Sequence, residues 1–223
     1  MKFSDKIYVW GDSIAKGVVM DAERGRYRIS KENCLTRLEK ENGAEIHNFA
    51  VMGNTSVQGL ERMNAGMPNE GGIAVIEFGG NDCDLDWKAA SERPDLQQEG
   101  KVPLKPFGEN LKKMIACARA AGMQPMLVTP PPLVAKRYFD WVSRNLNADR
   151  ILEYLGDVEH IYRWQERWAL MIRNVAREEN VRLLDVRDAF LAQPRMTDLI
   201  CIDGIHPNEK GHAMLYDLLT AGV

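Results

Sequence analysis

The apolar run Ile73-Ala74-Val75-Ile76-Glu77-Phe78 constrains the fold of this chain more than any other segment. A half-buried strand alternates apolar and polar residues, whereas a near-continuous apolar run is typical of a strand that is covered on both faces. Strands of this kind occur mainly in parallel sheets with helices on either side. The run therefore predicts a central strand of an α/β fold.

Strands and helices alternate along the rest of the chain. Further strands are predicted at Ile7–Trp10, Ala44–Phe49, Met126–Thr129 and Val181–Asp185. Helices are predicted over Ser30–Glu41, from Thr55 or Ser56 through Met63, and over Phe107–Ala121, Ile161–Glu179 and Asn208–Leu219. This order predicts right-handed βαβ units. Five strands with helices on both faces favour a three-layer, flavodoxin-like, doubly wound parallel sheet.

Three segments show no clear periodicity. Residues 14–27 are predicted to be a short helical turn followed by a loop, and residues 84–106 a charged surface excursion. Residues 131–160 are predicted to be an irregular insertion rich in aromatic side chains. At the start of the first helix, Ser30 and Asn33 form an imperfect capping box. Because no repeat or linker interrupts the chain, residues 1–223 are predicted to form a single domain.

The composition argues against several classes of partner. The 223 residues carry a net charge of -3 without a long basic block, which disfavours nucleic acid. No stretch approaches the roughly 20 apolar residues of a membrane span, and no apolar export segment precedes the first strand, so a cytoplasmic location is expected. The four cysteines are scattered and are expected to be free thiols. The sequence leaves homo-oligomerisation open.

Polar residues follow four of the predicted strands. Ser13 follows the first strand, Gly53 the second, Asn81 the third, and Asp203 and His206 lie in the loop after the fifth. In a doubly wound sheet, ligands bind beyond the carboxyl ends of the strands. Segments far apart in the chain are therefore expected to meet at one edge of the sheet.

The residue types at this edge suit acyl transfer. A serine hydroxyl becomes a good nucleophile when a histidine accepts its proton, and Asp203 is placed to orient and stabilise the ring of His206. Backbone N–H groups and the amide of Asn81 can stabilise a tetrahedral oxyanion. The chain contains no P-loop, G-x-G-x-x-G or H-E-x-x-H motif, and neither a cofactor nor a metal is expected.

Other interpretations of the same residues remain open at this point. Asp and Ser after a strand are preferred helix caps, and an Asp-x-x-His sequence before a helix is commonly a turn. The carboxylates of Asp12, Asp82 and Asp84 could serve a metal-dependent phosphohydrolase instead. A non-catalytic binding module with this fold is a third alternative.

Four short segments resemble the conserved blocks of the SGNH (GDSL-type) hydrolases, a family of esterases and lipases. They are Gly11-Asp12-Ser13-Ile14, the segment from Asn48 through Gly53-Asn54-Thr55-Ser56, Gly79-Gly80-Asn81-Asp82, and Asp203-Gly204-Ile205-His206-Pro207. Each block is weakly specific, but their order and their spread over residues 11–207 make the set highly specific. Asn54 stands where the family commonly has an Asp. The wording of the second and third blocks is most similar to the bacterial thioesterase and lysophospholipase branch.

The resemblance implies a flavodoxin-like fold and a role for each matched residue. Ser13 would be the nucleophile, His206 the base and Asp203 its acid partner. The backbone N–H groups of Ser13 and Gly53 and the side chain of Asn81 would form the oxyanion hole. The implied reaction is hydrolysis of a carboxylic ester through an acyl-enzyme intermediate.

The substrate is less well defined by the sequence. Short-chain acyl esters, including acetylated carbohydrates, are the first expectation, and a lysophospholipase or acyl-thioesterase activity is the alternative. Aromatic residues between Leu133 and Tyr162 could line an acyl or sugar pocket, because such rings offer apolar faces with polar handles. They could equally pack as a flap or a subunit contact.

Overall fold

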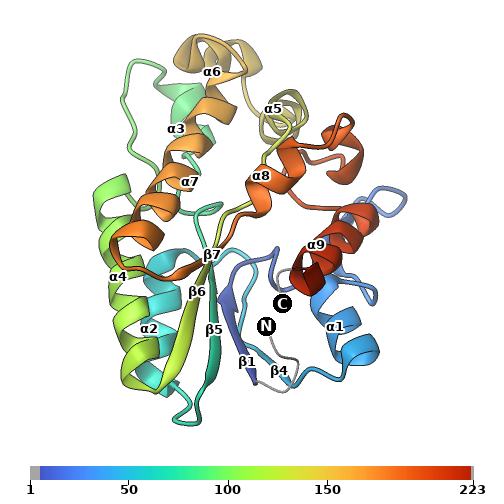
Figure 1. The fold of residues 1–223 in the computed structure, drawn as a ribbon. Helices are drawn as coiled ribbons and strands as arrows, with labels where there is room; N and C mark the ends of the chain where they lie inside the picture. The colour runs from blue at the N-terminus through green and yellow to red at the C-terminus, as the bar shows by residue number, and fades with distance from the viewer. Residues whose placement is uncertain (1–5, 222–223) are drawn as a thin grey trace.

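A five-stranded parallel sheet forms the centre of the computed structural model, which describes residues 6–221 (Figure 1). Its strands are β1 (Ile7–Gly11), β4 (Ile46–Asn48), β5 (Gly72–Glu77), β6 (Met123–Val128) and β7 (Arg182–Leu184). They lie in the order β4-β1-β5-β6-β7, and every neighbouring pair is parallel. The predicted doubly wound α/β sheet is confirmed. The winding reverses between β1 and β5, so the topological switch point lies at the ends of these two strands.

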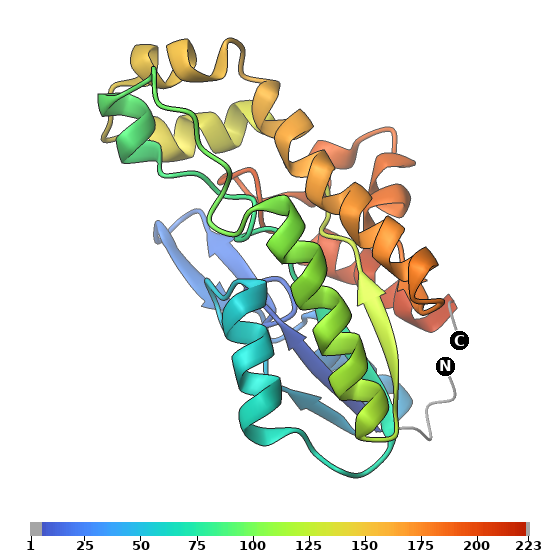
Figure 2. The ribbon, with the colours of Figure 1, turned by 90° about the vertical axis from the view of Figure 1, so that its left-hand side faces the viewer.

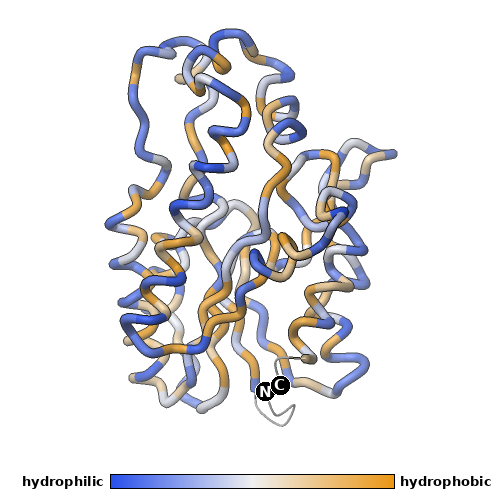
Figure 3. Tube along the Cα trace, turned by 45° about the horizontal axis from the view of Figure 1, so that its top comes forward, coloured by the Kyte–Doolittle hydropathy of each residue, from blue (hydrophilic) through white to orange (hydrophobic). Residues whose placement is uncertain are grey.

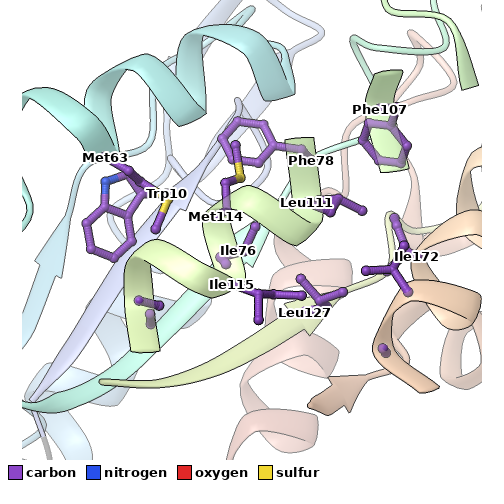
Figure 4. Close-up of a cluster of buried hydrophobic side chains, with 14 of the residues drawn as sticks. Trp10, Met63, Ile76, Phe78, Phe107, Leu111, Met114, Ile115, Leu127 and Ile172 are labelled. Carbon is purple, nitrogen blue, oxygen red and sulfur yellow. The ribbon is translucent and has the colours of Figure 1, made fainter. Parts of the chain in front are cut away.

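Alternate side chains of each strand pack against helices on opposite faces of the sheet. One face is covered by α2 (Ser56–Gly66), α4 (Leu104–Ala120) and α7 (His160–Glu178), as Figure 2 shows for α2 and α4. Trp10, Ile76 and Leu127 point into the apolar cluster on this face (Figure 4). The other face is covered by α1 (Cys34–Asn42), α8 (Val186–Leu191) and α9 (Glu209–Ala221). Burial on both faces explains the near-continuous apolar sequence of β5.

Apolar segments gather in the strands of the sheet in Figure 3, and the outer loops are largely hydrophilic. Within residues 6–221, no helix combines the length and the apolar character needed to cross a bilayer.

Helices above the carboxyl ends of the strands form a layer that we call the helical cap. It consists of α3 (Trp87–Glu92), α5 (Ala135–Ser143), α6 (Ala148–Leu155) and the first turn of α7 (Figure 1). A separate apolar cluster holds it together, with Ala90, Phe139, Ile151 and Ile161 fully or almost fully buried. The cap therefore has a small core of its own.

The prediction that residues 131–160 are irregular is wrong, because α5 and α6 occupy most of this segment. Its buried residues do follow helical spacing, at Ala135, Phe139 and Ser143 in α5 and at Ile151 and Leu155 in α6. Each helix is short, and aromatic side chains outside this spacing obscure the pattern. The predicted surface excursion at 84–106 likewise contains α3, and the loop before Asp203 contains α8 and a 3-10 turn at Met196–Leu199.

Residues 14–27 also differ from the prediction. In place of a helical turn and a loop, most of this segment contributes to an antiparallel hairpin of β2 (Val18–Asp21) and β3 (Arg26–Ile29). Two four-residue strands around a charged turn carry little periodicity, so the sequence gives a weak signal. Helix α1 begins at Cys34 rather than at Ser30, because the side chain of Asn33 caps it by accepting from Leu35 N and Thr36 N.

Stability at acidic pH tests the packing of α9 through His212. This side chain is fully buried, and burial lowers its pKa from 6.5 to about 4, against the opposing charge of Glu209. As the pH falls below 6.5 the unfolded chain takes up a proton that the folded chain refuses until about pH 4. Stability present at pH 7 is therefore lost across this window, by on the order of 3 kcal/mol.

We expect His212→Gln to flatten the dependence of the unfolding free energy on pH between 7 and 4, measured by urea denaturation. His47→Gln, at a partly exposed position, is the control and should keep the wild-type slope. Equal slopes in wild type and His212→Gln would contradict the assignment.

Candidate active site

Ser13 lies directly beyond β1, in a turn that the backbone holds tightly. Its side chain is almost buried. The carboxylate of Asp12 accepts a hydrogen bond from Ile14 N at 2.9 Å, and the Ser13 carbonyl accepts from Val18 N at 2.9 Å. The second bond joins the turn to the β2–β3 hairpin, so the position of the hydroxyl is set by two elements.

Asp203 and His206 share a tight loop between the 3-10 turn and α9. Cys201 N donates to His206 O at 2.8 Å, and Gly204 N donates to Cys201 O at 3.0 Å. Gly204 has a φ of +82°, and a Cβ atom there would lie 2.5 Å from Tyr138 N, so a glycine is required. Its carbonyl accepts from Val134 N at 2.8 Å, which ties this loop to the helical cap.

The structure brings the three predicted residues into one hydrogen-bonded chain. Ser13 Oγ lies 2.8 Å from His206 Nε2, and His206 Nδ1 lies 2.7 Å from Asp203 Oδ2. Asp203 Oδ1 accepts from the backbone N–H groups of Ile205 and His206. Burial alone would raise the pKa of Asp203, but the hydrogen bond and charge of His206 outweigh it, and the pKa is lowered. Asp203 is therefore a carboxylate at neutral pH and can stabilise a positive charge on the ring.

Asn81 joins the loops that follow three strands. Its amide nitrogen donates to Asp12 Oδ2 at 3.1 Å and to the Asn54 carbonyl at 3.0 Å. The first acceptor precedes Ser13, and the second follows Gly53. Both amide hydrogens are engaged in this structure, so an oxyanion would have to replace one of these acceptors.

The two predicted backbone donors are less closely associated. Among residues 6–221, neither the N–H of Ser13 nor that of Gly53 has a hydrogen-bond acceptor. Gly53 has a φ of +83°, which suits a glycine, and it is exposed in the turn after β4. Ser13 and Asn81 line the cavity beside the hydroxyl, whereas Gly53 does not. The oxyanion role of Gly53 therefore stays a prediction.

A pair of buried carboxyl groups supports the turn of Ser13 from below. Glu77, at the end of β5, accepts from Asp12 N at 3.3 Å and from Ala15 N at 3.4 Å through one oxygen. Burial raises the pKa of Asp12. Burial and the charge of Asp12 raise the pKa of Glu77 well above 4.5. Two carboxylates this close cannot easily both ionise, so we assign the proton to Glu77.

The other acidic residues considered for a metal site are bound to separate partners. Asp82 accepts from Ser56 N and Gly79 N and braces the loop of Asn81, and burial raises its pKa to about 6. Asp84 is neutralised by Lys101 Nζ at 2.8 Å. Within residues 6–221, no group of three or more His, Cys, Asp or Glu side chains is arranged to hold a metal ion.

Tyr27 is a site residue that the sequence did not reveal. It comes from β3, and its ring centroid lies 5.0 Å from that of His206. Its pKa is raised, first by burial and then by the negative charge of Asp203. Trp141 of α5 contacts the same ring edge-on, so the hairpin and the cap together shield the imidazole. The missed hairpin explains the omission, because a residue in a predicted loop carries no sign of such a contact.

A cavity of about 120 Å³ opens beside the Ser13 hydroxyl. Asp12, Ser13, Asn81 and His206 line one end of it. The helical cap and the adjoining loops line the rest, with the residues Leu85, Trp87, Leu133, Tyr138, Ile161, Trp164 and Ile205 among them. Some of the aromatic residues predicted for a pocket, Tyr138 among them, do line it, whereas Tyr154 does not.

Known proteins share this fold and sequence pattern. The curated acetylxylan esterase of Xylanibacter ruminicola is 27% identical over 157 residues, which are 68% of this chain but only 28% of that protein. The lipase/acylhydrolase from Enterococcus faecalis superposes with a TM-score of 0.68 at 21% identity, covering 98% of this chain and 94% of that one. For Axe2, an acetylxylan esterase from Geobacillus stearothermophilus, the TM-score is 0.64 at 17% identity, with coverage of 99% and 95%.

These structural likenesses show the shared fold. The sequence model of the GDSL-like lipase/acylhydrolase family matches residues 9–214, a range that includes Ser13, Asn81, Asp203 and His206. The chain belongs to the GDSL-like lipase/acylhydrolase family.

Proposed function

We propose that the protein is a serine hydrolase that cleaves carboxylic esters through an acyl-enzyme intermediate. The observation that carries the proposal is the hydrogen-bonded chain from Ser13 Oγ through His206 to Asp203, open at its serine end to a cavity. This arrangement of nucleophile, base and orienting acid is the one that activates a serine hydroxyl.

In the first half of the reaction, His206 Nε2 accepts the proton of Ser13 Oγ as the oxygen attacks the ester carbonyl. Asp203 holds the proton on Nδ1 and stabilises the imidazolium that forms. The N–H groups of Ser13 and Gly53 and the amide of Asn81 stabilise the oxyanion. The tetrahedral intermediate collapses, the ester C–O bond breaks, and the imidazolium transfers its proton to the departing alkoxide.

In the second half, His206 accepts a proton from a water molecule, whose oxygen attacks the acyl carbonyl. The same donors stabilise the second oxyanion. Breakdown of this intermediate releases the carboxylic acid, and the proton returns to Ser13 Oγ.

The named relatives suggest two classes of ester. Two of them are acetylxylan esterases, which supports acetylated carbohydrates as candidate substrates. One solved structure of the same fold is TesA, at a TM-score of 0.59 and 20% identity. The acyl-thioesterase alternative from the sequence therefore stays a proposal of second rank, because likeness at this identity concerns the fold.

Removal of the nucleophile is the direct test. We expect Ser13→Ala to abolish hydrolysis of p-nitrophenyl butyrate and labelling by a fluorophosphonate, because both need the Oγ atom. Ser91→Ala, whose hydroxyl bonds to the Lys88 carbonyl in α3, is the matched control and should behave as wild type. Full turnover by Ser13→Ala would end the proposal. Loss of wild-type turnover in EDTA would favour the metal-dependent alternative, and wild type that is neither labelled nor active would favour a binding module.

Truncation of Asn81 tests the oxyanion role. We expect Asn81→Ala to lower kcat about a hundredfold or more with little change in KM, because the lost donor acts mainly on the transition state. Asn110→Ala removes an amide that bonds to Ser56 in the adjacent helices and serves as control. A rise in KM at unchanged kcat would assign Asn81 to substrate binding instead.

The buried carboxyl pair predicts a dependence of stability on alkaline pH. Because the pKa of Glu77 is raised by folding, its contribution is present below pH 4.5 and is lost as the pH rises toward the folded pKa. Glu77→Gln cannot ionise and should gain stability relative to wild type as the pH rises from 5 to 9, measured by urea unfolding. Glu23→Gln, at an exposed position, should show no such gain.

A further inference from the structure

The cavity beside Ser13 has two ends of different chemistry. Its reacting end carries Asp12, Ser13, Asn81 and His206. Its remote end lies under the helical cap and presents the side chains of Leu85, Leu133, Ile161 and Ile205 together with aromatic rings. A bound ester would therefore place its carbonyl at the polar end and an adjoining group among apolar side chains.

The polar groups of the remote end are bonded to one another. Asp84 Oδ1 accepts from Trp87 Nε1 at 2.9 Å and from Tyr138 OH at 2.7 Å, while its second oxygen accepts from Lys101. Trp164 Nε1 donates to the Cys83 carbonyl at 2.8 Å. The carboxylate is thus neutralised and the indole N–H groups are occupied.

Gln165, the remaining amide in the lining, is also engaged at both ends. Its oxygen accepts from Arg187 Nη1 at 2.8 Å, and its nitrogen donates to the Pro131 carbonyl at 3.4 Å. A sugar placed here would bring several hydroxyl groups to a wall whose donors and acceptors are already paired. Unpaired hydroxyls in an enclosed site are unfavourable, whereas a hydrocarbon chain needs no partners.

The volume limits the length of such a chain. The cavity measures about 120 Å³. An apolar protein cavity of about 150 Å³ holds benzene, which has six carbon atoms. The space beside Ser13 therefore suits an unbranched chain of about four carbon atoms, including the carbonyl carbon at its polar end.

We propose that the helical cap encloses an acyl pocket that selects unbranched acyl groups close to butyryl in length, with Trp87 and Ile161 as walls that set the limit. This inference rests on the proposed function. It deepens that function by placing the acyl chain under the cap and the alcohol outside it. Acetylated and butyrylated alcohols then differ by how far they fill the pocket.

The test is a series of p-nitrophenyl esters from acetate to octanoate. We expect kcat/KM of the wild type to rise about fourfold for each methylene up to butyrate, which corresponds to about 0.8 kcal/mol per buried methylene. Beyond this length it should fall, on the order of tenfold by octanoate, because the chain then overfills the pocket.

Two variants should move this limit in opposite directions. Trp87→Ala enlarges the cavity and should shift the optimum to hexanoate or longer. Ile161→Phe reduces it and should preserve turnover of acetate while butyrate is lost. Tyr154→Ala truncates an aromatic residue of the same cap that does not line the cavity, and it should keep the wild-type profile. Opposite shifts cannot come from general destabilisation.

The result that would overturn the inference is a chain-length profile that stays flat or favours octanoate in an active wild type. A limit that appears instead when the alcohol is lengthened, in ethyl, butyl and hexyl acetates, would assign the pocket to the leaving group and overturn it as well. Absence of both turnover and fluorophosphonate labelling in the wild type would contradict the proposed function itself, which keeps the two failures distinct.

Discussion

The reversal of strand order between β1 and β5 is the constraint on which the site depends. The chain leaves β1 to build β4 on one side and returns to build β5 on the other, so the loops after β1 and β5 diverge above two adjacent strands. The hydrogen bond from Asn81 to Asp12 bridges that divergence. Ser13 lies beside this bridge, at the place where backbone N–H groups are left without partners.

Buried polar groups at this point are stable only because each has a specific partner. Asp203 accepts from two backbone N–H groups and is paired with His206, and Asp82 likewise accepts two backbone N–H bonds. A buried charge without such partners is strongly unfavourable. The carboxyl pair of Asp12 and Glu77 avoids that cost differently, because one proton shared within the pair leaves a single charge. The polar network therefore also fixes the geometry of the turns.

The helical cap separates substrate recognition from the reacting groups. The sheet and its loops position Ser13, Asn81 and His206, while α3, α5 and α7 close the cavity above them. The two parts meet at few points, among them the bond from Val134 N to the Gly204 carbonyl and the contact of Trp141 with Tyr27. Changes in the cap can alter the cavity without disturbing the loops that carry the site.

By itself the sequence determined the alternation of strands and helices, the parallel sheet, and the residues that follow each strand, because these depend on local periodicity and on short motifs. It did not determine the β2–β3 hairpin or the cap helices, since short elements packed by distant partners have weak local patterns. Only the tertiary structure brought Tyr27 onto His206 and joined Ser13 to a histidine 193 residues away. The shape of the cavity was also decided at that level, because its walls come from four separate segments whose packing no local pattern encodes.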